Sequence, residues 1–98
     1  MDDFNLILEC DGRQHFTQVA NWTNPEYTQK MDKYKMKCAN EHGYSVIRIF
    51  QEDIWNNKNN WEDNLKMSIR KYNNPTNILI GNQYKLFMLD DLSHCLVY

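Results

Sequence analysis

Apolar and polar residues alternate between residues 5 and 11, which predicts a β-strand. One face of that strand is apolar. The other becomes acidic at its end, where Glu9 and Asp11 stand two residues apart. A β-branched and aromatic run predicts another strand over residues 44–50. Arg48 is the charged residue in that run, and it either pairs with a carboxylate or reaches a substrate.

Two segments show helical spacing. The first begins at Asn24-Pro25, an N-cap candidate followed by proline, and ends before Gly43, a C-cap glycine. Its apolar residues recur at steps of four, three and four, which predicts a buried stripe made of Tyr27, Met31, Tyr34 and Cys38. A second helix is expected over residues 61–72, after a polar, asparagine-rich loop at residues 51–60.

The C-terminal third predicts more strand. Residues 77–80, the pair Gly81-Asn82 and residues 84–88 have the pattern of a β-hairpin with a tight turn. Residues 90–98 fit either a short helix or a strand. The predicted order is therefore β-α-β-α-β-β, an α/β fold with a mixed sheet. No repeat or linker divides the chain, so residues 1–98 are expected to form a single domain.

Composition narrows the function. The chain has 98 residues, 42% of them hydrophobic, and a formal net charge of −2, which argues against a general nucleic-acid binder but not against a local basic face. No apolar run is long enough to span a membrane, and the N-terminus lacks the pattern of a secretory signal. The three cysteines, Cys10, Cys38 and Cys95, form no CxxC pair, which indicates reduced thiols. We expect an intracellular protein, cytoplasmic or nuclear, with the composition of an AT-rich viral genome.

The strongest chemical signal is the acidic pair at the end of the first strand. Alternation places Glu9 and Asp11 on one face, roughly 6.6 Å apart along the strand. Two carboxylates, with Gln14 and His15 just beyond, can hold a divalent cation and activate a water molecule. An isolated Glu-x-Asp at a strand end is more often a solvated edge, so the flanking residues decide the interpretation.

Three motifs occur in order between residues 7 and 50: ECDGRQHF at residues 9–16, DKYK at residues 32–35 and GYSVIRI at residues 43–49. Together they resemble the very-short-patch-repair-like branch of the PD-(D/E)XK endonuclease superfamily, which includes phage and giant-virus proteins. The resemblance implies a small restriction-endonuclease-like core and metal-dependent hydrolysis of phosphodiester bonds in DNA, with Mg²⁺ or Mn²⁺ as the cofactor.

The resemblance also implies roles for individual residues. Glu9 would be the metal ligand, and Asp11 a second ligand or a water-positioning group. Gln14 and His15 would contact the scissile phosphate or assist proton transfer. Lys35, one helical turn from Asp32, would reach a phosphate. The implied nucleic-acid contacts are Arg13, Lys30, Lys33, Lys35 and Lys37. Three of these lysines, at positions 30, 33 and 37, could equally form a solvated helix face.

The chain departs from the superfamily pattern in two places. Relatives carry a first metal-binding aspartate on a strand upstream of the E-x-D-G motif. Asp3 would lie roughly 20 Å from Glu9 on one extended strand, too far to share an ion. The superfamily's lysine is also absent from the third motif, where Asp11 stands instead. Three explanations stay open: an inactive remnant, an aspartate from a second subunit, or a subgroup that uses Glu9 and Asp11 alone.

Two classes of function therefore compete. The first is a metal-dependent DNA endonuclease. The second is a catalytically degenerate nuclease fold that binds nucleic acid or protein, and a toxin–antitoxin or host-interaction role is a third class that nothing in the sequence favours. Because the strand pattern leaves a sheet edge unpaired, we expect a homodimer that completes the site or the sheet in trans.

Overall fold

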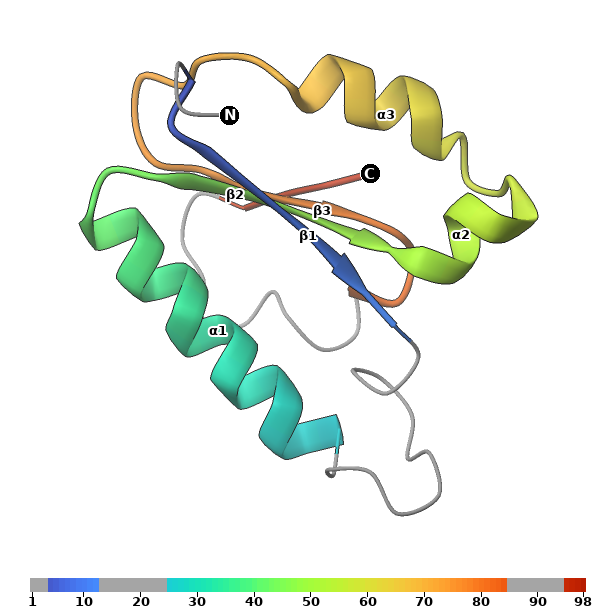
Figure 1. Cartoon of the computed structure of the whole chain (residues 1–98), viewed down its shortest axis with the longest axis horizontal. Coiled ribbons are helices and arrows are strands. Elements are labelled where there is room, and N and C mark those ends of the chain that lie inside the picture. Colours follow the sequence, from blue (N-terminus) through green and yellow to red (C-terminus); the bar gives the residue numbers. More distant parts are fainter. Residues whose placement is uncertain (1–3, 13–24, 85–94) are drawn as a thin grey trace.

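The computed structural model describes residues 4–12, 25–84 and 95–98. They form a three-layer α/β arrangement in which one helix covers one face of a sheet and two helices cover the other (Figure 1). The four strands are β1 (Leu6–Asp11), β2 (Ser45–Phe50), β3 (Asn77–Ile80) and β4 (Cys95–Val97). The three helices are α1 (Pro25–Glu41), α2 (Gln51–Asn56) and α3 (Trp61–Ser68).

The sheet is entirely parallel, with the strand order β1-β2-β3-β4. The prediction of a mixed, restriction-endonuclease-like sheet is therefore wrong. So is the predicted hairpin after β3: the neighbour of β3 is β4, whose chain continues to Tyr98, and the Tyr98 N–H donates to the Leu79 carbonyl at 2.9 Å. The second half of the predicted hairpin, residues 85–88, lies outside the described residues.

A turn at Gly81 explains why the chain does not reverse along β3. Gly81 has a φ of +141°, a conformation that side-chain-bearing residues rarely adopt. A Cβ at this position would lie 3.1 Å from the Cβ of Phe50. The chain then carries Tyr84 beneath the sheet on the α1 side, where its side chain is completely buried. The Gly-Asn pair is thus a real turn, but it directs the chain into the core rather than into a hairpin.

Helix α1 follows its predicted bounds but buries a different face. Gly43 has a φ of +87° just beyond the helix end, as expected of a C-cap glycine. The predicted buried stripe is wrong, because Tyr27 and Tyr34 are 59% and 62% exposed. The buried side chains of α1 are instead Gln29, Asp32 and Met36. The helix therefore turns two polar residues toward the sheet.

The segment after β2 is more helical than predicted, and the next helix is shorter. Helix α2 occupies the first half of the predicted asparagine-rich loop, and Asn57 ends it in a left-handed conformation, with a φ of 52°. Helix α3 ends at Ser68 rather than near residue 72. The Tyr72 hydroxyl donates to the Ser68 carbonyl at 2.8 Å, which satisfies a carbonyl of the last helical turn. No helix in the described part of the chain is long and apolar enough to cross a membrane.

The connections after β1 and β2 lead to opposite faces of the sheet (Figure 1). Since β1, β2 and β3 succeed one another in one direction across the sheet, these two crossovers must have opposite hands, and one belongs to the uncommon left-handed class. Where the helices after adjacent parallel strands diverge, the carboxyl ends of those strands are left open to a ligand. This topology directs attention to the ends of β1 and β2.

Candidate functional site

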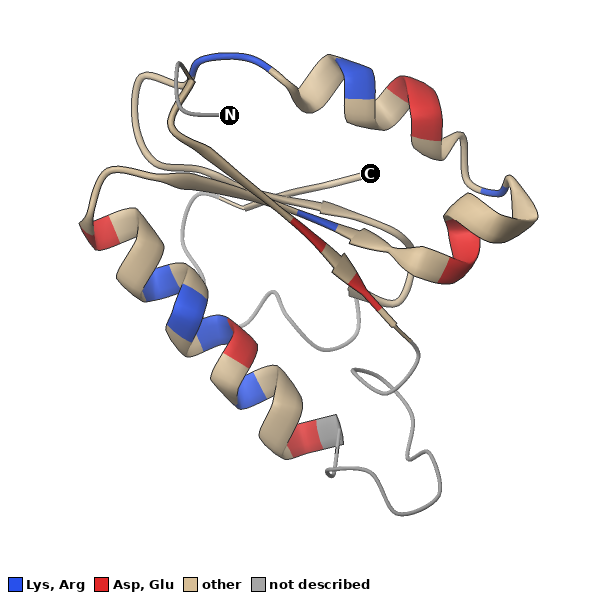
Figure 2. Cartoon of the chain, viewed as in Figure 1, with Lys and Arg blue, Asp and Glu red and all other residues tan. Residues whose placement is uncertain are grey.

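The ends of β1 and β2 bring charged residues together on the sheet face that α1 covers. Alternation along β1 directs Ile7, Glu9 and Asp11 to this face, as predicted for the two carboxylates. In the parallel register, Glu9 is the partner of Arg48 on β2. Figure 2 shows the two acidic positions of β1 beside the basic position of β2, opposite the lysines of α1.

Asp11 is held in a buried network. Its Oδ1 accepts a hydrogen bond from Nη1 of Arg48 at 2.7 Å, and its Oδ2 accepts one from the Tyr84 hydroxyl at 2.7 Å. All three residues are at most 3% exposed. Burial, followed by the charge of Asp11, raises the pKa of Tyr84 far above its usual range, so this phenol remains a hydrogen-bond donor.

Asp32 on α1 adds a second carboxylate to this network. Its Oδ1 lies 3.5 Å from Nη1 of Arg48, and the residue is 4% exposed. The guanidinium of Arg48 is therefore shared between β1 and α1, which explains why a polar residue of α1 faces inward. Within the described part of the chain, Nε of Arg48 is buried without a hydrogen-bond partner. That N–H is a donor for which residues 4–12, 25–84 and 95–98 supply no acceptor.

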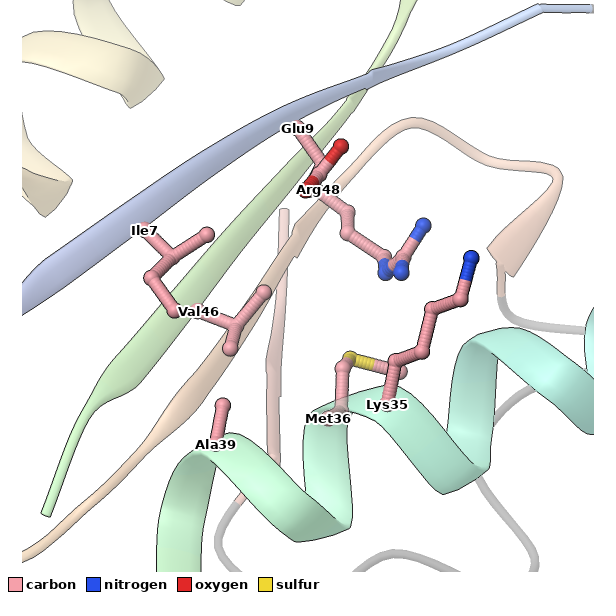
Figure 3. A pocket seen from close by; sticks show the side chains of 7 residues that line it. All are labelled: Ile7, Glu9, Lys35, Met36, Ala39, Val46 and Arg48. Carbon is pink, nitrogen blue, oxygen red and sulfur yellow. The ribbon is translucent and has the colours of Figure 1, made fainter. Parts of the chain in front are cut away.

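A small pocket, with a volume of about 100 Å³, adjoins this arginine. Its apolar walls come from the sheet and from α1: Ile7, Val46, Met36 and Ala39. Its charged groups are Glu9, Lys35 and Arg48. Figure 3 shows the Lys35 ammonium and the Arg48 guanidinium extending toward the same end of the pocket. The pocket combines one carboxylate with two cations above an apolar floor.

The structure separates the predicted site residues into three groups. Glu9 and Lys35 line the same pocket, and both are exposed. Asp11 points to the same sheet face but is buried against Arg48 and Tyr84. Three further predicted site residues, Arg13, Gln14 and His15, lie outside the described residues. Of the predicted basic stripe, Lys30 and Lys37 are exposed and Lys33 is half-buried.

The partners of Asp11 show where sequence reasoning fell short. Arg48 carried a signal, since a lone charge in an apolar strand needs a partner, and the structure provides two carboxylates. The sequence identified Asp32 only as part of the DKYK motif. It did not predict that Asp32 faces the sheet, because the neighbouring stripe with Tyr27 and Tyr34 is more apolar. Tyr84 carried no signal, because the predicted hairpin placed it on a strand 73 residues from Asp11.

Comparisons of the chain with known proteins found no matching family, no similar curated protein and no similar solved structure. The site therefore has to be interpreted from its own residues.

Those residues fit a divalent cation only in part. Mg²⁺ is commonly held by one or two carboxylates together with substrate phosphates and water. Glu9 meets that requirement because it is exposed at the pocket. Asp11 is 2% exposed and does not line the pocket, and its two oxygens accept hydrogen bonds from Arg48 and Tyr84. A cation at this site would depend on Glu9 and on oxygens supplied by the substrate.

Proposed function

We propose that this chain is a divalent-metal-dependent nuclease that hydrolyses phosphodiester bonds in DNA. The observation that carries the proposal is the meeting of Glu9 and Lys35 in one pocket. A carboxylate that can share a metal ion with a phosphate, next to a cation that can neutralise that phosphate, is the minimum equipment for this chemistry. The pocket spans the second to fourth positions of β1 and β2, between the sheet and α1, so the carboxylate and both cations face one space.

Each residue has a defined part in the proposal. Glu9 would hold Mg²⁺ or Mn²⁺ together with phosphate oxygens; such a cation would supply a water molecule of lowered pKa and positive charge beside the phosphate. Lys35 donates to a non-bridging phosphate oxygen. Asp11 fixes Arg48 and thereby the floor of the site. Gln14, His15 and Arg13 keep the phosphate-contacting and proton-transfer roles that the sequence resemblance implies.

The lysines of α1 extend the proposed DNA contact beyond the pocket. Lys30 and Lys37 are exposed on the same helix as Lys35, and Figure 2 shows the basic positions following one another along α1. Contacts to the DNA backbone release counterions, so binding should weaken as salt rises. Reversing charge at Lys37 should weaken binding and lower the salt dependence by about one ion. Unchanged affinity would identify these lysines as a solvated face.

Cleavage of a DNA panel tests the proposal. Linear, nicked, mismatched and branched duplexes would be incubated with Mg²⁺ or Mn²⁺ and with the wild type, Glu9→Gln or the control Glu41→Gln, which changes an exposed carboxylate at the end of α1. We expect metal-dependent cutting that falls by about 100-fold or more in Glu9→Gln and is unchanged in the control. Equal activity in all three proteins would remove Glu9 from the mechanism.

One observation favours the second candidate, a degenerate nuclease fold that binds nucleic acid without cutting it. Asp11, the second predicted ligand, is engaged by Arg48 and Tyr84. Under this alternative, the protein binds DNA in a salt-sensitive manner but cuts no substrate, even at concentrations that saturate the DNA. The same panel, read for binding as well as for cleavage, separates the two functions.

We also propose that a second copy of the chain pairs along β1. Within the described residues β1 has a neighbouring strand only on its β2 side, and Leu8 is 42% exposed. An open edge with an exposed apolar side chain is a site for pairing with another chain. Light scattering during size-exclusion chromatography should give a dimer at tens of micromolar, and Leu8→Lys should give a monomer. A wild-type monomer would contradict this pairing.

A further inference from the structure

The unpartnered N–H of Arg48 is the starting point. A guanidinium is always charged at neutral pH, and burying one of its donors without an acceptor is unfavourable. Arg48 is 3% exposed, and in the described part of the chain its Nε has no hydrogen-bond partner. The same residue lines the pocket beside Lys35. An acceptor entering the pocket would satisfy the donor.

The size and the charge of the pocket limit what that acceptor can be. A volume of about 100 Å³ is well below the 300 Å³ or more of a typical small-molecule site, so the pocket suits a small group rather than a whole nucleotide. Two cationic side chains converge there, as Figure 3 shows, and they require an anion. A phosphate group has the right charge, and its several oxygens can accept from both side chains at once.

We infer that the pocket is a phosphate subsite in which Nε of Arg48 and Nζ of Lys35 donate to the oxygens of one phosphate group, without any metal ion. Asp11 and Asp32 both contact Nη1 of the guanidinium, and Nε, which has no acceptor among the described residues, is the donor left for a ligand. Glu9 faces the same phosphate across the pocket and opposes its binding when no cation is present. The inference rests on the proposed function for one point only, the origin of the phosphate in DNA.

The signs of the expected effects follow from this geometry. Lys35→Gln removes a donor and a positive charge, and should weaken phosphate binding about tenfold. Glu9→Gln removes an opposing negative charge from an exposed position, and should strengthen metal-free binding about threefold. Lys71→Gln changes an exposed lysine outside α1 that does not line the pocket, and should leave binding unchanged. Opposite signs for Lys35 and Glu9 are the mark of a phosphate subsite.

Nuclear magnetic resonance can observe the proposed donor itself. The ¹H–¹⁵N spectrum would be recorded in EDTA, and the Nε–Hε signal of Arg48 identified by its absence from Arg48→Lys. The other arginines are Arg13 and Arg70. Inorganic phosphate, methyl phosphate and dimethyl phosphate would then be added in separate titrations. We expect saturable movement of the Arg48 signal. The apparent affinity should be weakened in Lys35→Gln, strengthened in Glu9→Gln and unchanged in Lys71→Gln.

The three probes distinguish the sources of phosphate. Binding of dimethyl phosphate supports a phosphodiester within a DNA strand, whereas binding of methyl phosphate alone indicates a terminal phosphate at a nick or an end, and would overturn the assignment to an internal phosphodiester. An Arg48 signal that does not move with any probe overturns the subsite, even if the wild type cuts DNA. Movement of the signal in a protein that cuts no DNA would retain the subsite and remove the proposed catalytic function.

Discussion

The two faces of the sheet are made from the same strands and differ in chemical character. On the face toward α2 and α3, the described strands bury no charged side chain, and their hydrophobic cluster is aliphatic: Leu6, Ile47, Ile49, Ile78 and Ile80. On the face toward α1, apolar residues alternate with the buried polar residues Asp11, Arg48 and Asn77. Strand β2 shows the contrast within six residues, because Ile47 and Ile49 point to one side and Arg48 to the other.

This difference assigns separate tasks to the two faces. Each aliphatic side chain buried on the α2 and α3 side stabilises the fold by about 1.5–3 kcal/mol. The buried ions on the α1 side incur a desolvation cost that their mutual attraction only roughly offsets. Because this charged network adds little net stability, we expect it to have another role. That role is to position Arg48 beside the pocket. The α2 and α3 face packs aliphatic side chains, and the α1 face combines a hydrophobic cluster with the charged site.

The largest expected effect comes from leaving the buried arginine without its closest partner. Asp11→Ala removes the acceptor at 2.7 Å from Arg48 and should lower the free energy of unfolding by about 4 kcal/mol. The triple variant Asp11→Leu, Asp32→Leu and Arg48→Met replaces the three buried ions by apolar residues and should recover most of that loss, yet bind no phosphate. Urea denaturation would measure both values. A triple variant no more stable than Asp11→Ala would show that the buried ions themselves stabilise the fold.

On the opposite face, Ile47→Ala should lower the free energy of unfolding by about 3 kcal/mol, because Ile47 is completely buried and its loss leaves a cavity. Phosphate binding at 15 °C should remain within about twofold of the wild type, measured by the Arg48 resonance under conditions where the variant is still folded. A large loss of phosphate affinity would contradict the separation between the two faces.

Tyr84→Phe tests the hydrogen bond that closes the network. Removing a donor to a buried carboxylate should cost about 2 kcal/mol in urea denaturation. The substitution should also change the alkaline limb of the stability profile. Since the pKa of Tyr84 is raised in the folded state, its unfolded form loses a proton first, and the stability it contributes is complete below about pH 10.

Above that pH the wild type should therefore lose more stability than Tyr84→Phe, by up to about 1.4 kcal/mol per pH unit. The difference between the two proteins cancels the contributions of the other tyrosines and of the cysteines. Parallel profiles between pH 9 and pH 11 would indicate that the phenol is not buried against Asp11 in solution.

The smallest effect is expected for an ion pair on the surface. Lys66 and Glu62 lie one turn apart on α3 at 3.1 Å, with side chains 69% and 60% exposed. Lys66→Gln should reduce the free energy of unfolding by about 0.4 kcal/mol and should do less at high salt. Comparing the losses of unfolding free energy in Lys66→Gln and in Asp11→Ala shows how much burial changes the cost of breaking an ion pair in this molecule. If Lys66→Gln lost more than about 1 kcal/mol of unfolding free energy, exposure would not predict the strength of this ion pair.

The sequence predicted the first half of the fold well because local signals and tertiary packing agree there. Alternation located β1, Pro25 and Gly43 bracketed α1, and the β-branched run located β2. The face of α1 was predicted wrongly because Tyr27 and Tyr34 form a more apolar stripe than the side that is buried. Arg48 overrides that pattern, since its charge requires the inward carboxylate of Asp32.

The second half was predicted less well, since long-range contacts decide it. A short apolar run such as residues 77–80 looks the same in a hairpin and in a parallel strand, and only its partner tells them apart. The site was partly predictable: Glu9 and Lys35 share a pocket, but no local pattern links Asp11 to Tyr84. Only the tertiary structure, which buries both Asp11 and Tyr84, shows that these two side chains meet.

The order of the strands has a consequence for how the protein comes into being on the ribosome. Each strand pairs with the one made just before it, so the sheet can grow in the direction of synthesis, strand by strand. The Asp11–Tyr84 bond cannot form until residue 84, four residues beyond β3, has been made. A nascent chain can thus assemble its first aliphatic contacts early, while the charged network acquires its final geometry only after Tyr84 has been made.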